Sequence, residues 1–226
     1  MKRLDKKHPL VIRWCHWVNF PLIVVMVWSG ILIYLANDVY RLGLGNITLF
    51  KFFPEKFYNF LNIGHRLAEG MGWHFTFIWP FLINGLVFVL YTAFSGEWRY
   101  LLPSRRSLAD AGRVVLHDLH LIKELPSQGK FNGAQRIAYT AVILMGAGSV
   151  VTGLAIYKPA QLSWLTKLLG GYQWARFEHF CLTMGYVVFF AIHVAQVVRA
   201  GWNNFRAMIT GYEVVQVEDA NAGRQP

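Results

Sequence analysis

The chain has 226 residues, of which 55% are hydrophobic and only 15% are charged. Roughly a quarter of the residues of an ordinary soluble domain are charged, so this composition excludes that class and indicates a membrane protein. The formal net charge of +10 does not indicate a nucleic-acid partner, because the lysines and arginines follow a pattern that membrane topology explains.

Four uncharged runs are each long enough to cross a bilayer as a helix, which takes about 20 residues. They are Trp14 to Asn37, Gly70 to Gly96, Ile137 to Tyr157 and His179 to Val198. The first run follows a basic start, but it is longer than a usual signal region and has no obvious cleavage site. We therefore predict an all-α membrane bundle of four helices, with spans at about 14–36, 71–95, 136–158 and 177–199.

The basic residues predict which side of the membrane each loop faces. Fifteen of the 22 lysines and arginines lie before the first span, between the second and third, and after the fourth. The more basic side is cytoplasmic, so both termini and the loop 96–135 are expected inside. Loops 37–70 and 159–176 are expected in the periplasm. We predict one membrane domain, 1–212, followed by a cytoplasmic tail, 213–226.

Four of the eight histidines lie in the spans or at their ends. His179 and His193 are fourteen residues apart, just under four turns, so their rings share one face about 21 Å apart along the helix. The alternating span directions place His16 at the inner level of His193, and His74 at the outer level of His179. Two such pairs are what two bis-histidine b-type haems require, one above the other.

Other interpretations of these histidines stay open. A single histidine at a span end is often only an interfacial hydrogen-bonding residue, and His65 is the main rival to His74. A zinc or copper site is less well supported, because it would need three or four ligands at one depth and only two of these histidines share each depth. Covalent c-type haem is excluded, because the chain contains no Cys-x-x-Cys-His motif.

Arginines at the span ends are candidates for pairing with haem propionates. Arg13, Arg136 and Arg199 lie at the inner ends, and Arg176 lies at the outer end. Each is explained equally well as an anchor that extends its charged group to the membrane surface.

The stretches around the histidines resemble a known family. "RWCHW" opens the first span, "WHFTFIWPFLINGLVFVLYTAFSGEWR" forms the second, and "RFEHF" and "AIHVAQVVRAGWNNFRAMITG" belong to the fourth. Together with parts of the third span, they resemble the bacterial cytochrome b561 and nickel-iron hydrogenase type cytochrome b family over residues 12 to about 212. The most similar branch is that of thiosulfate-reductase-like cytochrome b subunits, which pair with periplasmic sulfite-oxidase-like molybdopterin enzymes.

The resemblance implies a function for the chain. It implies two haems b, held by His16 with His193 and by His74 with His179, in the bacterial inner membrane. Electrons would pass between a periplasmic oxidoreductase, expected to depend on molybdopterin, and ubiquinone or menaquinone at the inner haem. Asn203 and Asn204, with Arg13, are candidates for the vicinity of the quinone. The whole complex could be an oligomer.

Three alternatives remain beside this interpretation. The chain could be the cytochrome b subunit of a nickel-iron hydrogenase or of a formate dehydrogenase, with the same chemistry and another partner. It could be a stand-alone superoxide:quinone oxidoreductase. A haem-free channel or transporter with a histidine proton relay is the most distant class.

Overall fold

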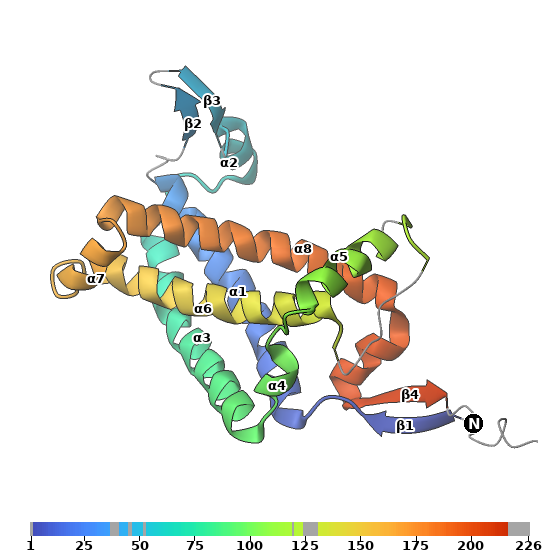
Figure 1. The fold of residues 1–226 in the computed structure, drawn as a ribbon. Helices are drawn as coiled ribbons and strands as arrows, with labels where there is room; N and C mark the ends of the chain where they lie inside the picture. The colour runs from blue at the N-terminus through green and yellow to red at the C-terminus, as the bar shows by residue number, and fades with distance from the viewer. Residues whose placement is uncertain are drawn as a thin grey trace, which may run out of the picture.

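The computed structural model describes residues 2–36, 41–44, 47–51, 53–118, 120–123 and 131–216. Its four long helices are α1 (Leu10–Ala36), α3 (Leu67–Ser95), α6 (Gly133–Tyr157) and α8 (Tyr172–Thr210). Each is long and apolar enough to cross a membrane. The predicted four-helix membrane bundle is therefore confirmed (Figure 1). The helices extend beyond the uncharged runs at several ends, most of all in α8.

The shorter elements lie between and beyond these helices. They are β1 (Lys2–Lys6), β2 (Arg41–Leu44), β3 (Ile47–Lys51), α2 (Glu55–Leu61), α4 (Trp98–Leu101), α5 (Ser107–Asp118), α7 (Ser163–Leu168) and β4 (Tyr212–Gln216). The strands form two antiparallel pairs, β1 with β4 and β2 with β3. The sequence predicted no strands, and β4 occupies the first residues of the segment expected to be a tail. The remainder of that tail lies outside the described residues.

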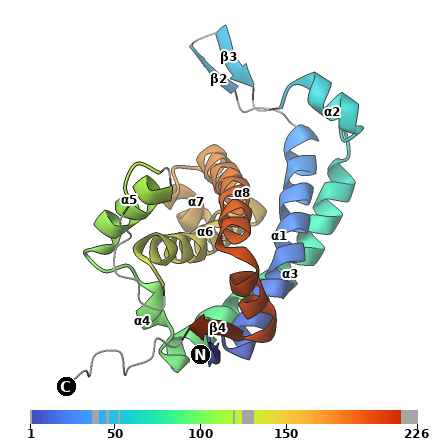
Figure 2. The ribbon, with the colours of Figure 1, turned by 90° about the vertical axis from the view of Figure 1, so that its right-hand side faces the viewer.

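The long helices pack as two pairs, α1 with α3 and α6 with α8. The pairs meet chiefly through α1 and α8, as Figures 1 and 2 show from two directions. Gly70 brings α3 close to α1, because a Cβ atom there would lie only 2.8 Å from the Cβ of Leu32. Small residues at such contacts let membrane helices approach closely. This arrangement leaves side chains of one helix pair facing those of the other.

An apolar core holds the two helix pairs together near one end. It consists of Leu32, Tyr34, Leu35, Ile63 and Phe180, all buried. Tyr34 of α1 and Phe180 of α8 stack with their ring centroids 4.8 Å apart. Aromatic pairs of this kind add about 0.5–1.5 kcal/mol beyond their buried area. This contact fixes the position of α8 relative to α1 close to the predicted outer histidines.

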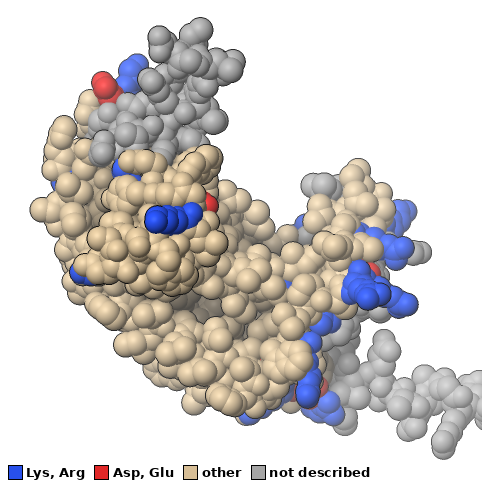
Figure 3. Space-filling model, turned by 60° about the vertical axis from the view of Figure 1, so that its left-hand side comes forward, with Lys and Arg blue, Asp and Glu red and all other residues tan. Residues whose placement is uncertain are grey.

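The opposite end of the bundle carries the first and the last described residues, in β1 and β4. Gly201 interrupts α8 with φ 80° and ψ 177°, a conformation that favours glycine because it has no Cβ atom. The chain then turns across the end of α1, and β4 pairs with β1 from Lys2 to Lys6. Lysines and arginines gather toward this end on the face drawn in Figure 3, whereas most of the rest of that face is uncharged. We call it the inner end and the other the outer end.

Candidate functional site

The outer pair of histidines joins the two helix pairs. His74 of α3 and His179 of α8 lie with their ring centroids 6.2 Å apart and their planes at 71°. Each ring also contacts a hydroxyl group of the neighbouring helix in its own pair. Ser29 Oγ lies 2.9 Å from Nδ1 of His74, and Thr152 Oγ1 lies 2.8 Å from Nδ1 of His179.

The inner pair has a similar separation but different surroundings. His16 of α1 and His193 of α8 lie with ring centroids 6.0 Å apart and planes at 60°. The rings of Trp17 and His16 lie edge to face with their centroids 5.2 Å apart, and the ring of Phe189 stacks on that of His193 with the centroids 5.6 Å apart. Nδ1 of His16 is buried and has no hydrogen-bond partner among the described residues. Each inner ring therefore has an aromatic neighbour, and His16 lacks the hydroxyl partner that the outer rings have among the described residues.

Both separations fit two imidazoles on opposite sides of one metal ion. A histidine nitrogen binds a first-row metal at about 2.0 Å, and the centre of the ring lies roughly 1 Å from that nitrogen. Two such ligands in line therefore place their ring centres roughly 6 Å apart, as in both pairs. The structure thus brings together each pair of histidines that the sequence predicted. Their number and spacing suit the axial ligands of two haems.

Glycines lie beside the outer rings, where a flat macrocycle would need room. A Cβ atom at Gly30 would lie 3.8 Å from Cε1 of His74, and one at Gly153 would lie 3.4 Å from Cε1 of His179. Both glycines therefore keep a side chain away from a ring edge. In the part of the chain that the structure describes, no three His, Cys, Asp or Glu side chains form a metal-binding cluster. The rival His65 is exposed in the connection that precedes α3.

The predicted propionate partners differ in their contacts. Arg13 donates a hydrogen bond to the carbonyl oxygen of Ile209, and its Nε is buried without a partner in the described ranges. Arg136 donates to the carbonyl oxygens of Leu102 and Arg99, at 2.8 and 3.0 Å. It therefore ties α6 to the end of α4.

The other two arginines lie on α8. Arg176 contacts Gln173 at 3.3 Å and lies over the ring of Tyr172, 5.9 Å from its centroid. Arg199 is exposed. Of the four arginines, Arg13 is the one with an unpartnered buried nitrogen beside a histidine pair, because it lies one turn before His16 on α1.

Asn203 and Asn204 hold the inner end together. The side chain of Asn203 both donates to the carbonyl oxygen and accepts from the amide of Val214, at 3.0 and 2.9 Å. Asn204 accepts a hydrogen bond from Lys7 Nζ at 3.2 Å, and the same ammonium group pairs with Glu213 at 2.6 Å. Asn203 therefore binds strand β4, and Asn204 binds Lys7, the residue that follows β1. The sequence did not predict either contact.

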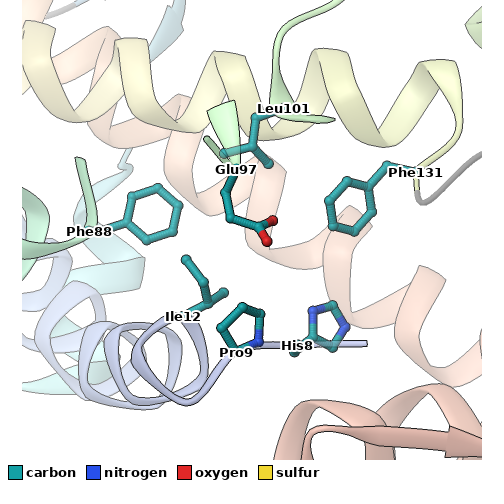
Figure 4. A pocket seen from close by; sticks show the side chains of 7 residues that line it. All are labelled: His8, Pro9, Ile12, Phe88, Glu97, Leu101 and Phe131. Atoms are coloured by element: carbon teal, nitrogen blue, oxygen red, sulfur yellow. The ribbon is translucent and has the colours of Figure 1, made fainter. Parts of the chain in front are cut away.

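A small pocket also lies at the inner end, and Figure 4 shows it from close by. Its volume is about 30 Å³, which is room for about one water molecule and too little for a quinone ring. The carboxylate of Glu97 and the ring of His8 both point into it (Figure 4). The lining residues are His8, Pro9, Ile12, Phe88, Glu97, Leu101 and Phe131.

Two residues of the site were missed from the sequence, namely Ser29 and Thr152. Both are buried, with 0% and 4% of their surface exposed. Hydroxyl side chains are common in membrane helices, where they usually bond to their own backbone, so neither residue attracts attention by type. The position of Ser29 along its span could have indicated its role. It lies thirteen residues after His16, which places it about 20 Å further along α1, near the level expected for His74.

Comparisons with known proteins identify the family of the chain. A family model described as prokaryotic cytochrome b561 matches residues 7–211. The chain is also 32% identical over 217 residues to a protein of Azospira oryzae, covering 93% of this chain and 99% of the relative. That relative bears the name "Putative protein-methionine-sulfoxide reductase subunit YedZ1". With four apolar spans and two facing histidine pairs, the chain belongs to the prokaryotic cytochrome b561 family of haem b proteins of the bacterial inner membrane.

Proposed function

We propose that this chain carries electrons across the membrane between quinone and a periplasmic oxidoreductase. Haem b supplies an iron centre that takes up and releases one electron at a time. His74 and His179 would hold one haem at the outer end, and His16 and His193 would hold a second at the inner end. The proposal includes an orientation with both termini in the cytoplasm.

The observation that carries this proposal is the match between the two histidine pairs. Their centroid separations are 6.2 and 6.0 Å, although the pairs are built from different helices, α3 with α8 and α1 with α8. The shared helix α8 sets them at two depths, about 21 Å apart along its axis. A pair of hydrogen-bonding histidines needs no such repeated distance, whereas two axial ligand pairs do.

Arg13 is our candidate for the propionates of the inner haem. It lies one turn before His16, and its buried Nε has no partner in the described part of the chain. A guanidinium group binds a carboxylate through charge-assisted hydrogen bonds. Arg136, Arg176 and Arg199 remain weaker candidates. Arg136 in particular already donates to two backbone carbonyl groups.

Quinone would exchange electrons with the inner haem from the lipid. The segment after Gly201 and the β1–β4 pair lie at the inner end. Trp17, next to His16, is 37% exposed, and Trp202 is 71% exposed. Tryptophan is the typical residue of the membrane interface. Access from the membrane therefore suits an apolar carrier such as ubiquinone or menaquinone.

The name of the relative suggests the partner and the direction of transfer. Quinol would release two electrons and two protons as it becomes quinone, and the electrons would cross one at a time. The periplasmic partner would use two electrons and two protons to convert a methionine sulfoxide into methionine and water. We assign that partner to the molybdopterin-dependent enzymes because of the sequence resemblance described above.

Haem content and electron transfer test the proposal on the purified chain. We expect two haems b per chain from the absorption of the pyridine haemochrome. A water-insoluble quinol should reduce them, and the periplasmic reductase with methionine sulfoxide should then reoxidise them. One haem per chain would contradict the arrangement in two pairs. Failure of any quinol to reduce a protein with two haems would overturn the role of quinone.

A further inference from the structure

The outer histidines are each held by a hydroxyl group that has a second partner. Ser29 Oγ contacts Nδ1 of His74 at 2.9 Å and the carbonyl oxygen of Met26 at 3.1 Å. Thr152 Oγ1 contacts Nδ1 of His179 at 2.8 Å and the carbonyl oxygen of Gly148 at 2.7 Å. The same chain of carbonyl, hydroxyl and imidazole is thus built twice, once in each helix pair.

The second partner sets the direction of each hydrogen bond. A hydroxyl group has one proton to donate. When Ser29 donates it to the carbonyl oxygen of Met26, its oxygen can only accept from Nδ1–H of His74. The same reasoning applies to Thr152 and His179. A neutral imidazole carries one N–H, so both rings keep a bare Nε2, which is the nitrogen free to bind a metal.

We propose that Ser29 and Thr152 are positioning residues of the outer haem site. Each accepts the Nδ1 proton of a ligand histidine, fixes its tautomer and orients its ring. This inference rests on the proposed function, because it takes His74 and His179 as axial ligands. A hydrogen bond from the outer nitrogen makes an imidazole a stronger electron donor. It therefore stabilises the oxidised iron and lowers the reduction potential of the outer haem.

At the inner site, at least one of the two rings has no such hydroxyl partner among the described residues. Nδ1 of His16 is buried without a hydrogen-bond partner among the described residues. The hydroxyl groups therefore distinguish the two ends of the electron path. Removing them should change the outer haem and leave the inner one as it is.

The experiment compares the intact protein carrying Thr152→Val with Thr152→Ser. Valine has nearly the shape of threonine without the hydroxyl group, whereas serine keeps the hydroxyl. The measurements are haem content, midpoint potentials from a spectroscopic redox titration, and the low-spin electron paramagnetic resonance signals. The outer haem is identified as the one whose signal is lost in His179→Ala. Ser29→Ala repeats the test on the ring of His74.

A matched control is Thr183→Val, in the helix of His179. The hydroxyl of Thr183 bonds the carbonyl oxygen of His179 at 3.0 Å, so it is back-bonded to its own helix. We expect Thr152→Val and Ser29→Ala to raise the outer midpoint potential and shift the outer resonance signal, with the inner haem unchanged. Thr152→Ser should restore the outer signal, and Thr183→Val should have no effect.

The outcomes separate this inference from the proposed function. Loss of the outer haem alone in Thr152→Val, with recovery in Thr152→Ser, also supports positioning, because outer partners of ligands contribute about 10–100-fold to affinity. Wild-type potentials and signals in a Thr152→Val protein with two haems would overturn the inference and leave the haem assignment intact. An equal effect of Thr183→Val would overturn it as well. Retention of both haems in His179→Ala would instead overturn the proposed function.

Discussion

The two histidine pairs have nearly the same separation but are built by different parts of the chain. The outer pair is fixed entirely by helices inside the membrane, since Ser29 and Thr152 hold its rings from neighbouring helices. Each ring of the inner pair lies against an aromatic ring, and the part of α8 after Gly201 packs beside it, where Phe205 and the carbonyl oxygen of Met208 contact Trp17. The same pair distance is therefore reached with hydroxyl groups that hold the rings at the outer end and with aromatic packing at the inner end.

This contrast agrees with the two tasks that we propose. Electron exchange with a protein partner at the outer end needs a centre in a fixed position. Exchange with a mobile quinone at the inner end needs a path by which the quinone enters, and therefore contacts that can open. A contact held by two short strands and a few side chains opens more readily than one buried between helices.

Removing a ligand histidine should have the largest effect. We expect His179→Ala to abolish the outer haem and His16→Ala to abolish the inner one, so that each variant keeps one haem per chain. The pyridine haemochrome assay and the redox titration measure both results. His65→Ala is the control and should keep two haems, because His65 lies exposed outside the helices. If His65→Ala lost a haem and His74→Ala did not, our outer pair would be wrong.

The long helices and the histidine pairs could be predicted because both depend on local regularities. An uncharged run of about 20 residues predicts a span. Helical periodicity then places His179 and His193 on one face of α8. Neither inference requires knowledge of which helices touch. The structure differs from these predictions mainly at the helix ends, where α8 continues past Val198 to Thr210.

The terminal strands and the hydroxyl supports could not be predicted in the same way. β1 and β4 lie at opposite ends of the chain, and neither is apolar enough to indicate a strand. They meet after the chain changes direction at Gly201, and Lys7 contacts Glu213 beside them. The roles of Ser29 and Thr152 depend on which helices are neighbours. Asn203 shows the same limit, since its depth alone did not predict that its side chain binds Val214.

Spacing between α1 and α3 provides the second test of the outer site. A Cβ atom at Gly70 would lie 2.8 Å from Leu32 Cβ and 3.1 Å from the carbonyl oxygen of Ser29. Gly70→Ala should therefore separate the two helices and weaken the contact between Ser29 and His74. We expect a loss of about 1–3 kcal/mol in the free energy of unfolding, measured by thermal denaturation, and a shifted outer midpoint potential.

The matched control for this substitution lies two residues further along α3. A Cβ atom at Gly72 would meet nothing within 4 Å, so Gly72→Ala makes the same chemical change in open space. We expect the melting temperature and both midpoint potentials to stay at their wild-type values or the stability to rise slightly, because alanine favours a helix. Equal destabilisation by both variants would mean that the close approach of α1 and α3 does not support the outer site.

A charge beside the inner pair provides the third test. Arg13→Gln removes a positive charge one turn from His16. Without that charge, the electron added on reduction of the inner haem should be less well stabilised. A Coulomb energy of about 1–2 kcal/mol at an effective dielectric constant near 20 corresponds to about 40–90 mV for one electron. We expect the inner midpoint potential to fall by this amount in a redox titration, with the outer one unchanged.

Two further variants show whether the effect comes from the charge at Arg13. Arg13→Lys keeps the charge and should keep most of the inner potential. Arg106→Gln removes an exposed positive charge from the connection before α5, where solvent screens it, and should change neither potential. A fall of the outer potential in Arg13→Gln would show that Arg13 does not belong to the inner site.

The smallest effect is expected at the inner end, where the N-terminal segment contacts β4. Lys7 and Glu213 form an ion pair at 2.6 Å, with side chains 21% and 27% exposed, so it should contribute about 0.5–1 kcal/mol. Lys7→Met should therefore speed hydrogen exchange of the β4 amides by roughly two- to fivefold.

Arg3→Gln is the control, because Arg3 pairs with Asp5 of its own strand at 2.9 Å, with side chains 66% and 42% exposed. That pair does not join β1 to β4, so its loss should leave the exchange of β4 unchanged. If Lys7→Met also changed the outer haem, the two sites would not be as independent as their construction from separate elements requires.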